Sequence, residues 1–172
     1  MNANSTTDNV VQLHPKDVFE ADKKWGPAVM KLGYSMIPSM IFWAQARLNL
    51  SPTQLVLLLH LADFWWDHDK MPFPSKAELA SRMGITERQI QRHMAQLEAD
   101  GFIKRNPRYH YKGGQQNNEY NLDGLVKKLK KFEPEFTKLK QEKQETKKKA
   151  KALTKVGGLV ANPVKPKKVK DE

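Results

Sequence analysis

The sequence of 172 residues predicts a mainly α-helical domain that carries a small β-hairpin. Three observations support this fold class. Helix-capping residues at Ser51, Ser75 and Thr86 are each followed by apolar residues at helical spacing. A glycine follows the second and the third of these segments, where helices commonly end. Two β-like runs then flank a polar loop that contains two consecutive glycines.

Changes in composition divide the chain into four predicted regions. Residues 1–22 are polar and lack periodicity, so we expect them to be disordered. Residues 23–49 form an aromatic-rich, partly helical extension, and residues 50–133 form the main domain. Residues 134–172 are rich in lysine and are predicted to be a flexible, disordered basic tail.

The aromatic-rich extension offers two roles for its large side chains. A proline can open a short helix whose inward residues are predicted to be Ile41, Phe42 and Ala44. Tryptophans are usually core residues, yet residues 25–49 could instead form a homodimer surface. Both alternatives stay open, and they can coexist.

The main domain begins with a helix that is predicted to be mostly buried. Ser51 is a good cap, and Pro52 fits the first helical position, where its missing N–H costs nothing. The leucine-rich run that follows has helical spacing. Two prolines near residues 72–74 end this segment.

Two short helices follow, and Gly84 separates them. Capping boxes are expected at their starts, between Ser75 and Glu78 and between Thr86 and Gln89. A helix that stops and restarts through a glycine turn can brace the second helix at a steep angle. This is the helix-turn-helix arrangement, in which the second helix enters a groove of DNA.

The helix that begins at Thr86 has one apolar row and one basic face. The apolar row consists of Ile90, Met94 and Leu97, and Gly101 is expected to end the helix. The opposite face carries arginines flanked by glutamines: Arg88, Gln91, Arg92 and Gln96. Such side chains can pair with guanine and adenine edges in the major groove, although arginines opposite a core are often only a solvated face.

A hairpin is predicted after this helix, with arms at residues 102–105 and 119–122. Its basic residues and tyrosines suit contact with backbone phosphates, and basic–aromatic alternation also suits single-stranded nucleic acid. A last amphipathic helix starts near Leu122, and Pro134 is expected to end or kink it.

Positive charge is concentrated in two parts of the chain. The whole chain has a net charge of +11, and the part from Lys127 onward holds 16 lysines against 6 acidic residues. In the remainder, residues 82–112 hold 7 basic and 3 acidic residues. Localised basic patches favour a nucleic-acid partner.

Several classes of function lack their sequence signals. The chain has no cysteine, which excludes disulfides and thiolate zinc sites. His68 and the aspartates near it lack metal-ligand spacing, and no nucleotide-binding or hydrolase motif is present. We therefore expect no enzyme activity, no cofactor or metal, and no small-molecule ligand. With neither a signal peptide nor a membrane span, we expect a cytoplasmic, nucleoid-associated protein.

The stretch FPSKAELASRMGITERQIQRHMAQLEADGFIKR resembles the winged helix-turn-helix domains of bacterial, phage and plasmid regulators and replication proteins. The shared features are a Leu-Ala pair, an apolar-Gly-apolar turn, two spaced arginines and a closing Gly-apolar-Ile. The resemblance covers roughly residues 50–122. It does not explain the aromatic extension or the lysine-rich tail.

The resemblance implies roles for individual residues. Arg88, Gln91 and Arg92 would read bases. Polar and basic residues at the two helix starts and on the wing would contact the DNA backbone: Ser75, Lys76, Thr86, Gln89, Lys104, Arg105, Arg108, His110 and Lys112.

The predicted function is sequence-specific binding of double-stranded DNA by a transcriptional regulator. The recognition helix, residues 86–100, would lie in the major groove, and the wing, residues 104–118, would lie on the backbone. One alternative is a plasmid or phage protein for replication initiation or partition. Another is a protein-interaction adaptor that uses the winged fold without reading bases.

Overall fold

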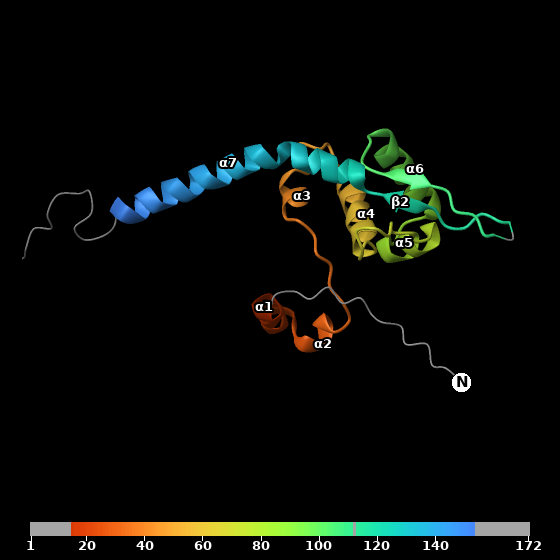
Figure 1. Ribbon diagram of the computed structural model, residues 1–172, viewed down its shortest axis with the longest axis horizontal. Helices are drawn as coiled ribbons and strands as arrows, with labels where there is room; N and C mark the ends of the chain where they lie inside the picture. Colours follow the sequence, from red (N-terminus) through yellow and green to blue (C-terminus); the bar gives the residue numbers. More distant parts are fainter. Residues whose placement is uncertain (1–14, 112, 154–172) are drawn as a thin grey trace, which may run out of the picture. The chain divides into compact units, whose positions relative to one another are not determined.

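A computed structural model describes residues 15–111 and 113–153 of the chain (Figure 1). It confirms the predicted mainly helical fold with one antiparallel two-stranded hairpin in the described part. The elements, in chain order, are α1 (Pro15–Trp25), α2 (Pro27–Met30), α3 (Met40–Trp43), α4 (Pro52–Asp63), α5 (Lys76–Met83), α6 (Glu87–Ala99), β1 (Lys104–Asn106), β2 (Glu119–Asn121) and α7 (Asp123–Leu153).

The chain divides into two compact units, residues 1–129 and residues 130–172. Helix α7 begins in the first unit and continues into the second. No helix among the described residues is long and apolar enough to cross a lipid bilayer.

Helix α4 lies at the centre of the first unit. Its start has the predicted cap, because the Ser51 side chain accepts a hydrogen bond from the Gln54 amide and the Gln54 side chain accepts one from the Ser51 amide. Leu57, Leu58 and Leu61 are fully buried. Burial of one such side chain stabilises a fold by about 1.5–3 kcal/mol. Both α5 and α6 pack against α4.

The start of α5 differs from the prediction in one hydrogen bond. The Ser75 hydroxyl accepts from the Glu78 amide at 2.9 Å, as expected for a cap. The Glu78 carboxylate, however, accepts from Arg82 at 3.1 Å. The expected reciprocal capping box between Ser75 and Glu78 is therefore wrong, because the positive charge of Arg82 takes the carboxylate.

The turn between α5 and α6 has the predicted geometry. Gly84 is left-handed, with φ 64° and ψ 31°, which a residue with a Cβ adopts only at a cost. The Ile85 amide donates to the Ala80 carbonyl at 3.1 Å and so closes the turn. Thr86 and Gln89 form the predicted capping box at the start of α6.

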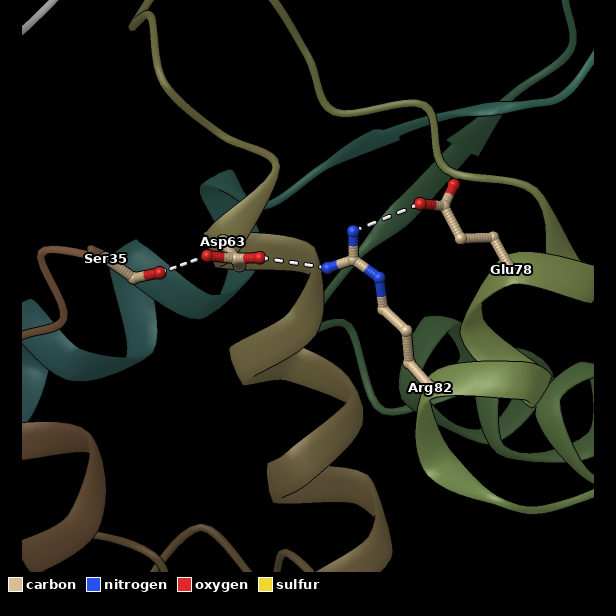
Figure 2. A network of polar contacts seen from close by, with 4 residues as sticks. All are labelled: Ser35, Asp63, Glu78 and Arg82. Carbon is tan, nitrogen blue, oxygen red and sulfur yellow. Dashed lines mark hydrogen bonds and ion pairs between the residues drawn. The ribbon is translucent and has the colours of Figure 1, made fainter. Parts of the chain in front are cut away.

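A network of polar contacts fixes α5 on α4 (Figure 2). The Arg82 guanidinium donates to Asp63 at 3.0 Å and to Glu78 at 3.1 Å. It also lies 4.3 Å from the centre of the Phe64 ring. The Ser35 hydroxyl donates to the same Asp63 carboxylate, so a residue of the aromatic-rich extension is attached to α4 (Figure 2).

The hairpin begins directly after α6. The Phe102 amide donates to the Leu97 carbonyl at 2.8 Å, and the amide of the left-handed Gly101 donates to the Glu98 backbone carbonyl at 2.9 Å. These two hydrogen bonds end the helix. Strands β1 and β2 pair antiparallel, with Arg105 opposite Tyr120. The outer edge of β2 also forms a backbone hydrogen bond, in which the Tyr120 amide donates to the Pro72 carbonyl at 2.9 Å.

Helix α7 starts at a point of very close backbone approach. A Cβ built on Gly124 would lie 2.2 Å from the Gly101 carbonyl oxygen and 2.9 Å from that of Phe102. The Leu125 amide donates to the Phe102 carbonyl at 2.8 Å. The first turn of α7 therefore rests on the backbone that joins α6 to the wing.

Two predicted disordered regions are helical in part. Helix α1 includes residues 15–22, and α7 continues through Pro134 to Leu153 instead of ending there. Proline removes one helical hydrogen bond, but the lysines, glutamates and glutamines around it are good helix formers. The rest of the predicted disorder, residues 1–14 and 154–172, lies outside the described residues.

Glu98 ties α6 to the first strand of the wing. Its carboxylate accepts from the Arg105 backbone amide at 2.8 Å and from the Arg105 side chain at 2.6 Å. Burial alone would raise the pKa of Glu98, but the hydrogen bonds and charge of Arg105 outweigh it and lower that pKa below its ordinary 4.5.

We expect Gly124→Ala to lower the free energy of unfolding by about 1–3 kcal/mol, because the added Cβ forces apart two segments of backbone. Chemical denaturation followed by circular dichroism measures this change. Lys127→Ala is the matched control, since Lys127 is exposed on the same helix. Equal stability of the two variants would contradict the close approach.

We expect Glu98→Gln to destabilise the protein by about 1 kcal/mol at neutral pH, because the charged partner of Arg105 is lost. A carboxyl whose pKa is lowered by folding contributes stability above its unfolded pKa and loses it as the pH falls through its folded pKa. The difference from the parent should therefore be constant above about pH 5 and shrink as the pH falls below 4.5.

Unfolding free energies measured between pH 3 and pH 8 check this second prediction. Glu145→Gln, at an exposed position of α7, is the matched control for the loss of one carboxylate and should leave the unfolding free energy at neutral pH nearly unchanged. A Glu98→Gln difference that stays unchanged down to pH 3 would contradict the role of the ion pair.

Candidate nucleic-acid interface

Helix α6 presents a polar face directly opposite its buried row. Ile90 and Leu97 are 0% exposed and Met94 is 1% exposed, which fixes the rotation of the helix. Arg88, Gln91 and Arg92 are exposed, as the helical spacing predicts. The three side chains predicted to read bases are thus together on one outward face.

The two arginines of this face are not engaged within the described protein. Neither Arg88 nor Arg92 forms an ion pair or hydrogen bond with another described residue. An arginine guanidinium has five donors in a planar fork, which suits bidentate contact with a base edge or a phosphate. Their hydrogen-bonding capacity is therefore available to a partner.

The start of α6 supplies backbone donors. The side chains of Thr86 and Gln89, both predicted backbone contacts, bond to each other and to each other's amides. They shape the helix end, while the first amides of the helix, those of Glu87 and Arg88, have no partner in the helical ladder. Such amides and the positive end of the helix dipole attract an anion such as a phosphate.

The start of α5 lies beside a hollow that the sequence did not indicate. The hollow has a volume of about 260 Å³ and is lined by Lys76, the return arm of the wing and nearby residues: Pro74, Gln115, Gln116, Asn117, Asn118 and Tyr120. Ser75 is occupied as the cap, whereas Lys76 is exposed. The signal for these amides in the sequence is the run QQNN, a polar pattern that by itself indicates only a loop.

The basic residues of the wing fall into two groups. Lys104 and His110 are exposed, and Tyr109 and Tyr111 are 68% and 85% exposed. The hairpin tip is closed by backbone hydrogen bonds, including His110 to the Gly114 carbonyl at 3.0 Å. Lys112, also predicted to contact DNA, lies outside the described residues.

Arg105 and Arg108 belong to the second group, because both are paired within the protein. Arg105 binds Glu98, and Arg108 lies 3.3 Å from Glu119 and 4.5 Å from the centre of the Phe73 ring. In this structure both side chains hold the wing in place, and their contact with the DNA backbone stays a prediction.

The loop after α4 contains the acidic cluster considered in the sequence. His68 lies 2.9 Å from Asp69, and this hydrogen bond raises the pKa of the exposed imidazole. Within residues 15–111 and 113–153, no group of three or more His, Asp or Glu side chains could hold a metal ion.

The aromatic-rich extension is only partly packed into the core. Ile41 and Ala44 are buried as predicted, but Phe42 is 49% exposed, so its inward placement was wrong. Trp25 and Trp43 are 61% and 55% exposed, which excludes full burial for either. Consecutive residues of a helix point about 100° apart, so Phe42 does not share the buried side of α3 with Ile41.

Residues 48–103 match the family model described as a helix-turn-helix domain. No curated protein sequence matches the chain. The chain is similar to the crystal structure of the N-terminal domain of DnaD from Geobacillus kaustophilus HTA426, with 23% identity, 77% of this chain and 99% of that chain covered, and a TM-score of 0.47.

Two transcriptional regulators have lower similarity. A possible transcriptional regulator from Methanosarcina mazei Go1 has 18% identity, 59% and 82% coverage of this and that chain, and a TM-score of 0.38. A further transcriptional regulator has 19% identity, 67% and 72% coverage, and a TM-score of 0.36. Similarities at this level carry no information about function.

The family match spans α4, α5, the Gly84 turn, α6 and the beginning of the wing. It ends at Ile103, one residue before β1. Residues 48–103 are therefore similar to a helix-turn-helix domain, and the arrangement of α5, the Gly84 turn, α6 and the hairpin that follows is that of a winged helix-turn-helix fold.

Proposed function

We propose that this protein binds double-stranded DNA with sequence specificity and acts as a transcriptional regulator. The observation that carries the proposal is the exposed face of α6, where Arg88, Gln91 and Arg92 lie opposite the buried row and both arginines lack partners among the described residues. Helix-turn-helix domains place such a helix in the major groove.

The side chains of this face have the chemistry needed to contact base edges, which supports a role beyond that of a solvated surface. An arginine can bind the O6 and N7 atoms of guanine in bidentate fashion, and a glutamine can bind adenine in the same way. Ala95 and Ala99 continue the same side of α6 and are exposed. Their small side chains permit close approach of the helix to the floor of the groove.

The backbone contacts that we propose differ from the sequence-based set. Lys76, Lys104 and His110 keep their proposed role, because they are exposed at the start of α5 and on the wing. At the start of α6 the proposed donors are main-chain amides, with Thr86 and Gln89 shaping the helix end. Ser75 has a similar role at α5, and Lys112 remains a proposed contact from sequence alone.

The charge distribution supports a polyanionic partner. Residues 82–112 carry 7 basic and 3 acidic residues, and the part from Lys127 onward carries 16 lysines against 6 acidic residues. Exposed lysines add attraction to DNA that is independent of the DNA sequence and is weakened by salt.

The two alternative functions differ in their need for this interface. A role in replication initiation or partition would use the same DNA-binding face of α6, whereas a protein-interaction adaptor would not need Arg88.

Homodimerisation through residues 25–49 remains a proposal. It is supported by large apolar side chains that are about half or more exposed on the extension: Trp25, Val29, Leu32, Met36, Phe42 and Trp43. Exposed apolar patches of this kind often mark interaction surfaces.

We expect Arg88→Ala to weaken binding to the preferred duplex by about 1–3 kcal/mol and to relax the preference at one base position. Selection of bound sequences from a random duplex pool, followed by titration of the selected site, measures both effects. Lys31→Ala, which removes one exposed positive charge outside α6, is the control and should leave the preference intact.

Arg88→Lys separates base reading from charge. It retains the positive charge but loses the planar fork, so base preference should fall while the salt dependence of binding stays. Unchanged preference and affinity in both Arg88 variants would overturn the proposal and favour the adaptor.

We expect removal of residues 154–172 to weaken binding to all duplexes alike. This segment contains five lysines and two acidic residues. Log affinity falls as log salt concentration rises, and each lost phosphate contact makes this dependence shallower by about 0.9. Replacement of the five lysines by glutamine at constant length should reproduce the effect. A truncation that changes the preferred sequence would contradict a purely electrostatic role.

A further inference from the structure

The tip of the wing carries aromatic rings that the body of the domain leaves exposed. Tyr109 and Tyr111 are 68% and 85% exposed. The centre of the Tyr111 ring lies 4.9 Å from that of His110, so these two rings form a tilted pair that is still open to solvent. The loop that joins the two strands extends away from α5 and α6 (Figure 1). Exposed apolar groups gathered at one place commonly mark a binding surface.

Main-chain hydrogen bonds keep the two arms of the hairpin paired beyond β1 and β2. The Gln116 amide donates to the Arg108 carbonyl at 2.8 Å, and Tyr109 and Gln115 form an isolated antiparallel bridge one position nearer the tip. Residues directly opposite each other in an antiparallel pair project their side chains to the same face. The Tyr109 ring and the Gln115 carboxamide therefore share one face of the hairpin.

The hollow beside the return arm of the wing adds hydrogen-bonding groups to this face. Its lining includes the four carboxamide side chains of residues 115–118 and Lys76 at the start of α5, and none of its lining residues is acidic. A carboxamide has both donors and an acceptor, which is the combination that pairs with the Watson–Crick edge of a base. Gln115 belongs both to the hollow and to the bridge with Tyr109, so rings and carboxamides form one continuous surface.

Rings and carboxamides together suit unpaired bases. In a duplex, both faces of a base are stacked and its Watson–Crick edge is already paired. An unpaired base can stack on an aromatic ring and bind a carboxamide through its free edge.

The charge of the wing favours a nucleic acid over a second copy of the chain. Residues 104–118 contain four lysines or arginines and no aspartate or glutamate. Phosphates that accompany the bases are attracted to such a segment, whereas two identical wings would repel each other.

We propose that the wing tip and the hollow form a site for the unpaired bases of single-stranded DNA, with Tyr109 and Tyr111 as stacking platforms. This goes beyond the proposed reading of duplex DNA by α6, because it uses other residues and another form of DNA. Binding at this site has little sequence preference, since every base has a face that can stack. Glu98 ties the wing to α6, so a stretch of open DNA next to a duplex site can contact both.

Binding of the full-length protein to a fluorescently labelled oligothymidylate of about 20 nucleotides tests the stacking by fluorescence anisotropy. Salt at about 0.2 M weakens the attraction due to lysines. Tyr109→Ala should raise the dissociation constant by about tenfold, and the double variant with Tyr111→Ala should raise it further. Tyr109→Phe retains the ring and should bind as tightly as the wild type.

Two controls separate stacking from general effects of losing a ring. Trp66→Ala removes a ring that is 56% exposed outside the wing, and it should leave the affinity for oligothymidylate unchanged. A duplex of the same length should be far less sensitive to the tyrosine variants than the single strand, because its bases are already stacked. Circular dichroism of each variant checks that its helix content is unchanged.

A second pair of experiments locates the bases. Gln115→Ala combined with Gln116→Ala removes two carboxamides of the hollow and should raise the dissociation constant by about threefold to tenfold. An unchanged constant would exclude the hollow from the site. Irradiation of oligothymidylate that contains 5-iododeoxyuridine should cross-link it to Tyr109 or Tyr111, as mapped by mass spectrometry. Cross-links confined to residues outside the wing would contradict the proposal.

Three further outcomes would overturn the proposal. The first is a wild-type protein that does not bind oligothymidylate at about 100 µM. The second is wild-type affinity in the double tyrosine variant, which would assign the binding to lysines alone. The third is an equal loss in Tyr109→Phe and Tyr109→Ala, which would assign the contact to the hydroxyl group. None of these measurements depends on the duplex preference read with the Arg88 variants, so the two proposals can fail separately.

Discussion

The burial of one row of side chains on α6 determines how the rest of the domain can act. Ile90, Met94 and Leu97 are almost completely removed from solvent, so α6 cannot rotate without exposing them. Exposure of three such side chains would cost about 5–9 kcal/mol, which is comparable to the whole stability of a small domain. The outward position of Arg88 and Arg92 is a consequence of this burial.

The arginines of the domain have two distinct roles that residue type alone does not reveal. Arg82 links α5 to α4 through Asp63 and Glu78, and Arg105 links the wing to α6 through Glu98. Both lie next to acidic groups that become neighbours only after folding. Arg88 and Arg92 have no such neighbour among the described residues, which is why we assign the proposed recognition to them.

The wing is placed by main-chain contacts on both sides. Gly124 allows α7 to begin directly on the backbone of Gly101 and Phe102, and the Tyr120 amide binds the Pro72 carbonyl on the other edge. Burial raises the pKa of Tyr120, which is 3% exposed in this region. The hairpin arms are therefore held in the domain, while the tyrosines of the tip remain exposed.

The sequence alone determined the local features of this protein. The left-handed turn at Gly84, the caps at Ser51 and Thr86 and the apolar row of α6 depend on residues within one or two helical turns, so their patterns could be read directly. The sequence also predicted which face of α6 is exposed. The distribution of positive charge along the chain could be read directly from the positions of its lysines and arginines.

Only the tertiary structure decided which polar groups are already occupied. The partners of Arg105 and Arg108 are 7 and 11 positions away in the sequence, and Asp63 is 19 positions from Arg82, so no local pattern predicts these pairs. The continuation of α7 through Pro134 was missed because proline is a local signal for a helix end, whereas the good helix formers on both sides outweigh one lost hydrogen bond. Ion pairs between distant residues depend on how the chain packs, and the helix propensity of a long segment is a sum over many residues. Short sequence motifs report neither of these.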